Sequence, residues 1–185
     1  MNMKMYAIRR SIVRERDYQP QESGFTVQVK RDGTPLESSQ YESVTVDERV
    51  MEWNDAKHIH AWFVKNVQNG VDNRDEYVVQ SAHLEKLLAV CEKVLHASHL
   101  VPETDFSALL DVWPSPSSAA MRSHQKVIKN VSTAHKLLPA RSDGSAEPYG
   151  EAYLKAVDDT RSWILRMLAD AKDGVRGTLY YSTSW

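Results

Sequence analysis

The sequence has 185 residues, of which 42% are hydrophobic and 26% are charged, a composition that is ordinary for one globular domain. Its 23 basic and 25 acidic residues give a formal net charge of −2, which argues against binding to duplex nucleic acid through bulk charge. The single cysteine, Cys91, excludes an internal disulfide and a thiolate-rich metal site. The mean hydropathy of −0.51 and the lack of a long apolar run argue against a membrane partner. We expect a single domain over residues 1–185 in the cytoplasm, because residues 1–6 contain no apolar signal core.

The first 45 residues predict two strands, because β-forming residues alternate with polar ones and helical periodicity is missing. The predicted strands are Met3–Ile12 and Phe25–Lys30. A turn rich in Asp, Gly and Pro follows the second strand at Arg31–Pro35.

Helical periodicity begins at Asp47, a residue type that suits an N-cap, and ends before Gly70. The segment Arg74–Gln80 is predicted to be a short extended link into a second helix that begins at Ser81. Apolar residues recur on this second helix at spacings of three and four, which indicates a buried face: Leu84, Leu87, Leu88, Cys91, Val94 and Leu95. The position of Cys91 on this face predicts an inert, buried thiol.

The prolines and serines of Val101–Ser118 predict a loop. A third helix is expected at about Ser118–Leu138, and a fourth helix ends at Gly174. The fourth helix has an apolar stripe at helical spacing: Tyr153, Val157, Thr160, Ile164, Met167 and Ala171. A final strand is predicted at Thr178–Trp185. Together these elements predict an α+β fold, with a small antiparallel sheet of N- and C-terminal strands packed on about four helices.

The first predicted helix carries a histidine on its apolar face. His60 lies in the middle of an arc made by Trp53, Ala56, His60, Phe63, Val64 and Val67. It is either a neutral core histidine that donates to one carbonyl or a polar group at the floor of a pocket. Trp62 points away from Trp53, so one partner surface cannot bury both rings. Either two layers enclose the helix, or Trp62 and His58 face a ligand or a second protomer.

The third predicted helix lies in a region of unbalanced positive charge. Residues 112–142 contain no Asp or Glu and two His, and they contain five basic residues: Arg122, Lys126, Lys129, Lys136 and Arg141. On a helix the first three share one face, which suits either a solvated surface or a ridge that binds phosphate groups.

The sequence lacks the motifs of common enzymes and metal sites. Its seven histidines form no His-Glu-x-x-His pattern, and it has no phosphate loop, dinucleotide glycine fingerprint or nucleophile elbow. Asp158 and Asp159 diverge by about 100° on the fourth helix, so their carboxylates cannot act on one bond. We therefore expect no catalytic residue, no metal and no cofactor.

Several stretches within residues 50–185 have a familiar pattern. They are the run Trp53–Gly70, Glu76-Tyr77 with Ser81–Leu95 behind it, Leu137–Pro139, Tyr153 and Tyr180–Trp185. Together they resemble a family of uncharacterised proteins encoded by bacteriophages and prophages. The matching positions include Trp53, His60, Trp62, Phe63, Asn66, Tyr153, Tyr181 and Trp185. The chain departs from the family at Asn54-Asp55, where the family has Arg-Lys, at Lys57, where it has Asn, and at Ser142–Pro148, where it has a loop rich in Gly and Phe.

This resemblance implies a phage accessory protein that acts against host defence in an infected bacterium. Combined with five Trp and eight Tyr, it leads to a first hypothesis, a non-catalytic sponge that sequesters a small phosphorylated nucleotide signal. Base rings would stack on aromatic side chains, and phosphates would meet Arg or Lys. The predicted ligand-binding residues are Lys57, His60, Asn66, Tyr153 and Arg161, with Arg122 and Lys126 in reserve.

Two alternatives stay open at this point. One is a protein-binding inhibitor or adaptor that acts on a host factor, with Trp62, Trp113 and Trp185 as interface anchors. The other is a nucleotide hydrolase that uses His60 with a carboxylate supplied by the fold. We also expect a homo-oligomer, because shared aromatic surfaces often form symmetric dimers.

Overall fold

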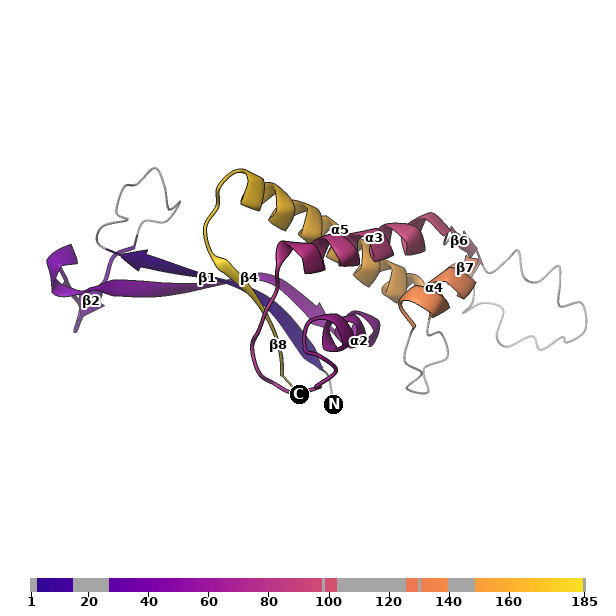
Figure 1. Cartoon of the computed structure of the whole chain (residues 1–185), viewed down its shortest axis with the longest axis horizontal. Helices are drawn as coiled ribbons and strands as arrows, with labels where there is room; N and C mark the ends of the chain where they lie inside the picture. Colours follow the sequence, from indigo (N-terminus) through magenta and orange to yellow (C-terminus); the bar gives the residue numbers. More distant parts are fainter. Residues whose placement is uncertain are drawn as a thin grey trace, which may run out of the picture.

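One layer of the molecule is a four-stranded antiparallel sheet, and the long helices pack beside it (Figure 1). The computed structural model describes residues 3–14, 27–97, 99–102, 126–129, 131–139 and 149–184. In chain order the elements are β1 (Lys4–Arg14), β2 (Lys30–Arg31), β3 (Thr34–Pro35), the 3-10 helix η2 (Ser38–Gln40), β4 (Ser43–Asn54), α2 (Lys57–Asn66), β5 (Tyr77–Val78), α3 (Ser81–Ala97), β6 (His99–Pro102), β7 (Lys126–Lys129), α4 (Val131–Leu137), α5 (Glu151–Lys172) and β8 (Thr178–Ser184). The strand order of the sheet is β4-β1-β8-β5. The fold is therefore of the predicted α+β class.

The helices cover the face of the sheet on which Met5 lies. Met5 is fully buried and pairs with Trp53 of β4, so the two side chains share one face. On this face Trp53 meets Trp163 of α5 edge to face, with ring centroids 5.1 Å apart. Tyr181 of β8 stacks on Phe63 of α2 with centroids 4.0 Å apart. Both α2 and α5 are thus fixed to the sheet by aromatic contacts.

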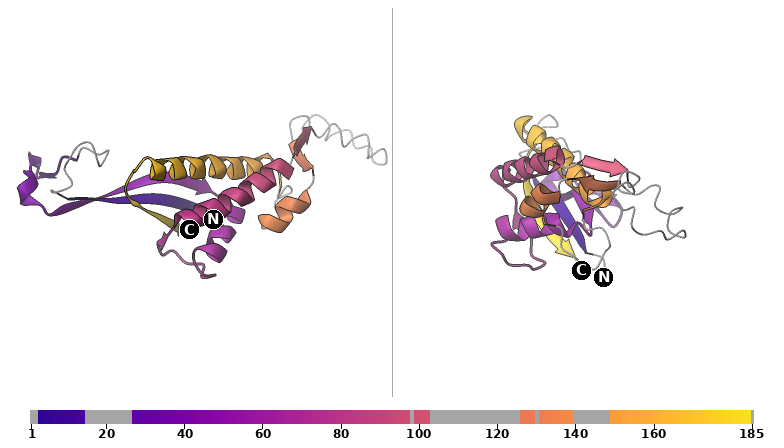
Figure 2. Two further views of the ribbon diagram at one scale, coloured as in Figure 1. Left: turned by 45° about the horizontal axis from the view of Figure 1, so that its top comes forward. Right: turned by 90° about the vertical axis from the view of Figure 1, so that its right-hand side faces the viewer.

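Helices α3 and α5 bury the faces that their spacing predicts, and they lie against each other in the structure (Figure 2). The buried residues are Leu84, Leu87, Cys91 and Val94 on α3, and Tyr153, Leu154, Val157, Thr160, Trp163, Ile164 and Met167 on α5. Ala171 is exposed, so the predicted stripe of α5 is wrong at its last residue. Cys91 is buried, as predicted, and burial raises the pKa of its thiol to about 12, which disfavours the nucleophilic thiolate.

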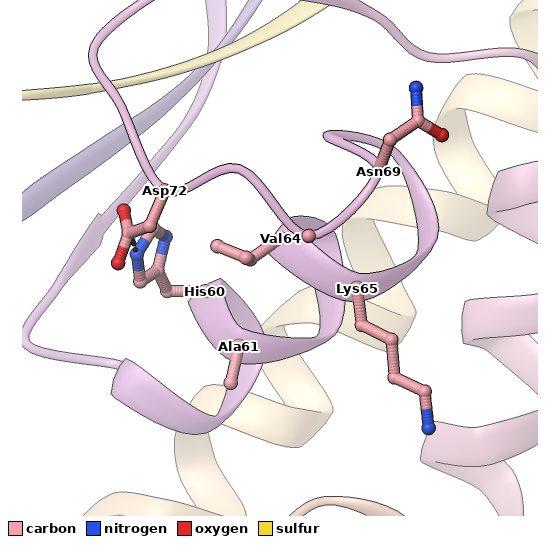
Figure 3. Close-up of a pocket in the computed structure, with 7 residues that line it drawn as sticks. His60, Ala61, Val64, Lys65, Asn69 and Asp72 are labelled. Carbon is pink, nitrogen blue, oxygen red and sulfur yellow. Dashed lines mark hydrogen bonds and ion pairs between the residues drawn. The ribbon is translucent and has the colours of Figure 1, made fainter.

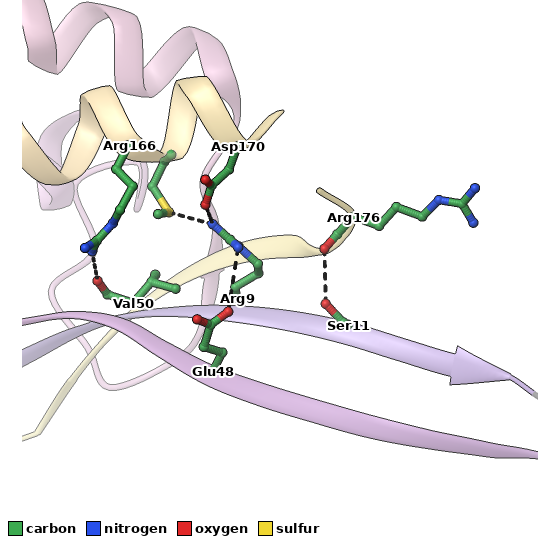
Figure 4. A network of polar contacts seen from close by, with 8 residues as sticks. Arg9, Ser11, Glu48, Val50, Arg166, Asp170 and Arg176 are labelled. Atoms are coloured by element: carbon green, nitrogen blue, oxygen red, sulfur yellow. Dashed lines mark hydrogen bonds and ion pairs between the residues drawn. The ribbon is translucent and has the colours of Figure 1, made fainter. Parts of the chain in front are cut away.

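Arg9 joins three elements at the far end of α5 (Figure 4). Its guanidinium pairs with Asp170 of α5 and lies 3.6 Å from the Glu48 carboxylate of β4. Nearby, Arg166 of α5 donates to the carbonyl oxygen of Val50 over 2.9 Å, beside the point where the β1–β4 register shifts. These contacts fix the C-terminal half of α5 on the sheet.

The first predicted helix is wrong over its N-terminal part, because Asp47–Asn54 belongs to β4. The predicted N-cap, Asp47, lies inside the strand, and its carboxylate accepts two hydrogen bonds from Arg10 of β1 at 2.7 and 2.8 Å. Helix α2 begins only at Lys57. This segment forms a strand because it pairs with β1. The cross-strand partners are distant in the sequence, so a local pattern does not show them.

The third predicted helix is also shorter than expected. Lys126–Lys129 forms β7, which pairs with β6, and α4 covers only Val131–Leu137. The expected helical face shared by Arg122, Lys126 and Lys129 is therefore wrong, and Arg122 lies outside the described residues. The start of the predicted Val101–Ser118 loop is also wrong, because Val101 and Pro102 belong to β6.

The predicted turn at Arg31–Pro35 is confirmed as a hairpin between β2 and β3. Asp32 and Gly33 form the turn, with φ angles of 51° and 81° that suit these residue types. The strand predicted before it, Phe25–Lys30, is wrong over Val27–Val29, because β2 covers only Lys30–Arg31, and Phe25-Thr26 lies outside the described residues. None of the described helices is both long and apolar enough to cross a membrane.

Candidate functional site

A pocket of about 390 Å³ lies beside the C-terminal half of α2 (Figure 3). Its lining residues are His60, Ala61, Val64, Lys65, Asn69, Gly70 and Asp72. The volume falls within the range of small-molecule sites. Lys65, Asn69 and Asp72 are exposed, whereas His60 is only 3% exposed. The pocket thus combines a buried imidazole with a polar rim that solvent can reach.

A tight reversal after α2 creates one wall of this pocket. Asn69 and Gly70 have φ angles of 53° and 82°, in the left-handed region that Asn and Gly tolerate best. The Gly70 amide donates to the carbonyl of Val64 over 2.7 Å, which closes the end of the helix. The chain then turns back along α2 and carries Asp72 to His60.

His60 connects the pocket to the core through both nitrogen atoms of its ring. Nδ1 lies 2.8 Å from the Tyr181 hydroxyl, and Nε2 lies 3.0 Å from Asp72 Oδ1. Burial, and to a lesser extent the charge of Asp72, raises the pKa of Tyr181, so its hydroxyl stays protonated and can donate to Nδ1. The network then places the imidazole proton on Nε2, where it is donated to Asp72. In this arrangement each ring nitrogen of His60 faces one partner.

The loop that carries Asp72 is held to the sheet at two further points. Thr183 of β8 donates its hydroxyl to the Asn73 carbonyl over 3.1 Å. Arg10 of β1 donates to Glu76 over 2.8 Å. The carboxylate of Asp72 therefore has a fixed position before any ligand arrives.

Three of the predicted ligand-binding residues lie on α2, and only one of them lines this pocket. His60 is in the lining, as the pocket alternative for this residue requires. Lys57 forms the first turn of α2 and is not among the lining residues. Asn66 donates its side-chain amide to the Trp62 carbonyl over 2.8 Å, within the helix itself.

The other two described candidates lie on α5, and neither lines this pocket. The Tyr153 hydroxyl donates to the Leu138 carbonyl over 2.8 Å, and its ring packs on His58 with centroids 4.3 Å apart. Arg161 lies 4.0 Å from carboxylate oxygens of Glu92 on α3 and of Asp158 on its own helix. Tyr153 thus belongs to the core, and Arg161 lies in the contact between two helices.

Trp53 lies on β4 and Trp62 lies on α2, so the predicted opposition of the two rings on one helix is wrong, and both rings are buried. Trp53 is 3% exposed and donates its indole N–H to Thr160 over 2.8 Å. Trp62 is 8% exposed and meets Phe63 edge to face at 5.4 Å, which leaves little surface for a partner. The remaining predicted site positions lie outside the described side chains: Trp113, Trp185, Arg122 and Lys126, of which only the last has a described backbone.

Sequence reasoning missed Lys65, Asn69 and Asp72. Asp72 follows His60 by 12 positions and lies beyond the end of α2, so a periodicity search within one helix cannot relate the two. The signal that could have found it is the Asn69-Gly70 pair, a combination that favours a left-handed turn and therefore a chain reversal.

The polar residues of the pocket lie at two opposite ends (Figure 3). Asp72 and His60 lie together at one end, Lys65 and Asn69 lie at the other with their side chains pointing away from each other, and Val64 lies between the two ends. A carboxylate accepts hydrogen bonds and an ammonium group donates them. The arrangement suits a small ligand with donor groups at one end and an anionic group at the other.

Among the residues that the structure describes, no cluster of three or more His, Cys, Asp or Glu side chains could hold a metal ion.

No family model, no curated protein and no solved structure matches the chain.

Proposed function

We propose that the chain binds a small nucleotide-type ligand in the pocket beside α2 and does not turn it over. The observation that carries this proposal is the placement of Asp72 and Lys65 at opposite ends of one pocket. A nucleotide has hydroxyl and amino donors on its nucleoside part and an anionic phosphate at its other end. Lys65 would meet the phosphate as a point charge, while Val64 and Ala61 would contact the sugar or the base.

The hydrogen bonds of His60 favour binding over hydrolysis. The fold does bring a carboxylate, Asp72, to His60, as the hydrolase alternative requires. A general base, however, needs a free lone pair within reach of the attacking water. Nδ1 of His60 faces the Tyr181 hydroxyl in the core, and Nε2 carries its proton toward Asp72. The histidine is therefore suited to hold the carboxylate in place.

The resemblance to phage and prophage proteins supplies the setting of the proposal. In an infected bacterium the chain would act as a sponge that lowers the free concentration of a nucleotide signal of host defence. Because a sponge acts by mass action, the protein would have to accumulate to concentrations comparable with that of the signal.

A thermal-shift screen against mononucleotides, dinucleotides and cyclic nucleotides tests the proposal. A ligand at 100 times its Kd stabilises the folded chain by about 2.7 kcal/mol. For a domain of this size the Tm should rise by roughly 5 to 10 °C. The bound nucleotide should be recovered intact after long incubation with excess protein. A screen without any shift contradicts the proposal, and repeated turnover of the nucleotide supports the hydrolase alternative instead.

Lys65→Gln should weaken nucleotide binding by about tenfold, because one charge-assisted contact to phosphate is lost. Isothermal titration calorimetry measures the change. Lys86→Gln is the matched control, since Lys86 is exposed on α3 and is not part of the pocket lining. Equal affinities of the two variants would show that phosphate does not bind at Lys65.

A further inference from the structure

The backbones of His60 and Lys65, which line opposite ends of the pocket, have a defined separation along α2. Lys65 follows His60 by five residues on this helix, which corresponds to about 7.5 Å along its axis at about 1.5 Å per residue. Asp72 lies at the His60 end, 3.0 Å from the imidazole. A ligand that reaches both ends must therefore separate its donor groups from its anionic group by several bonds. An α-amino acid, which carries its ammonium and carboxylate groups on one carbon, is too short.

Asp72 has capacity left for a ligand. Its side chain is 43% exposed, and its Oδ1 accepts the hydrogen bond from His60. A carboxylate has about four lone-pair sites, so further donors can bind to its two oxygens. Two hydroxyl groups on adjacent carbons match these two oxygens, because each hydroxyl can donate to one of them.

The site is also organised before binding. His60 is buried and holds Asp72, and the next residue, Asn73, is held by Thr183 of β8. Binding of a ligand therefore costs little conformational entropy in the loop that carries Asp72, which favours higher affinity.

From these observations we infer that the ligands are ribonucleotides, bound with the 2′ and 3′ hydroxyls on Asp72 and the phosphate on Lys65. This inference rests on the proposed function and adds to it a substrate class and an orientation. A 2′-deoxynucleotide has only one of the two hydroxyls, so it should bind more weakly.

The test compares matched ligands on the full chain. The probes are the 5′-monophosphates of adenosine, guanosine, cytidine and uridine, their 2′-deoxy forms and the four ribonucleosides without phosphate. Isothermal titration calorimetry should give a ribonucleotide affinity that is about tenfold higher than that of the 2′-deoxy form. This comparison needs no variant, so it does not depend on the folding of a mutant.

Two variants then assign the two ends separately. Asp72→Asn keeps the size of the side chain but should reduce the ratio of ribo to deoxy affinity to about one, while the phosphate still contributes. Lys65→Gln should remove most of the difference between nucleotide and nucleoside and leave the ribo to deoxy ratio unchanged. Asp173→Asn, which changes an exposed carboxylate beyond the end of α5, is the control and should alter neither ratio.

The failures of the inference and of the proposed function are distinguishable. Equal binding of ribo and deoxy forms by the unchanged protein overturns the inference and leaves nucleotide binding in place. A loss of affinity in Asp72→Asn that is equal for both forms also overturns it, because Asp72 would then only shape the loop. Binding of none of the monophosphates, combined with no shift in the wider nucleotide screen, overturns both.

Discussion

Tyr181 is fully buried in the core. Its hydroxyl contacts His60, the buried residue that also lines the pocket. The ring stacks on Phe63, and the hydroxyl lies 2.8 Å from His60 Nδ1. The Asp72 carboxylate can only accept, so the proton of the ring lies on Nε2, and the Tyr181 hydroxyl can donate to Nδ1. The hydrogen bond of Tyr181 thus supports His60, and His60 in turn holds the Asp72 carboxylate at one end of the pocket.

Tyr181→Phe should lower the free energy of unfolding by about 1 to 3 kcal/mol, because it removes one partner of a buried hydrogen bond. Urea unfolding followed by circular dichroism measures the loss. Tyr180→Phe is the control: this neighbour on β8 is partly buried, and its ring, under the Arg10 guanidinium at 4.8 Å, is kept. If both variants are as stable as the original chain, the hydrogen bond between Tyr181 and His60 does not stabilise the fold.

His58 is the second buried histidine of α2 and has a different environment. It is 7% exposed, and its Nε2 has no hydrogen-bond partner among the described residues. Burial lowers the pKa of His58 from 6.5 to about 4. Between these two values the unfolded chain binds a proton that the folded chain does not. The contribution of His58 to stability is therefore complete above pH 6.5 and is lost as the pH falls toward 4.

His58→Phe should make the free energy of unfolding less dependent on pH within this window. The slope should decrease by up to about 1.4 kcal/mol per pH unit, which corresponds to one proton, and the ring contact with Tyr153 should be kept. Urea unfolding at about pH 7, 6, 5 and 4.5 compares the variant with the original chain. Parallel pH profiles would show that His58 titrates normally in the folded state.

At the scale of elements, the sequence pattern predicts helices correctly where the residues that share a face are close in the sequence. The stripes of α3 and α5 could be predicted because residues three and four apart face the same neighbour. The strand β4 could not, because its partners lie far earlier in the chain: Glu48 faces Arg9, Asp47 faces Arg10 and Trp53 faces Met5. Glu, Arg and Met have no strong intrinsic preference for strands, so only the pairing with β1 reveals the element.

The connection from α5 to β8 depends on a residue without a side chain. Gly177 has a φ angle of 136°, and a Cβ atom there would lie 2.8 Å from both Arg9 Cγ and Ser11 Oγ. Arg9 cannot easily move away, since Asp170 and Glu48 hold its guanidinium. The close approach of this connection to β1 thus requires glycine.

Gly177→Ala should lower the free energy of unfolding by about 2 to 3 kcal/mol, through backbone strain and the clash with β1. Gly174→Ala is the matched control, because Gly174 has a φ angle of 80° but open space, with no atom within 4 Å, where its Cβ atom would lie. The control should cost only about 1 kcal/mol, the usual penalty of a left-handed alanine. Equal losses in denaturant unfolding would show that β1 accommodates the extra methyl group.

At the scale of the whole molecule, the fold class follows from sequence more readily than the site does. Strands near both ends with helices between them are enough to predict an α+β arrangement. The pocket depends on a reversal at Asn69-Gly70 that brings Asp72 back to His60, and no pattern over α2 alone contains that information. Candidates chosen for their polar tips, such as Asn66 and Tyr153, instead donate their hydrogen bonds to backbone carbonyls.

The strand order has a consequence for how the chain acquires its structure. Thr178–Ser184 follows every other described element in the sequence, yet β8 lies between β1 and β5. During synthesis β1 can pair early with β4, but its other edge stays open until β8 emerges from the ribosome. Within the described residues β5 pairs only with β8, so the last strand joins the two parts of the sheet. Such late, long-range pairing slows folding and leaves a strand edge available to other nascent chains in the meantime.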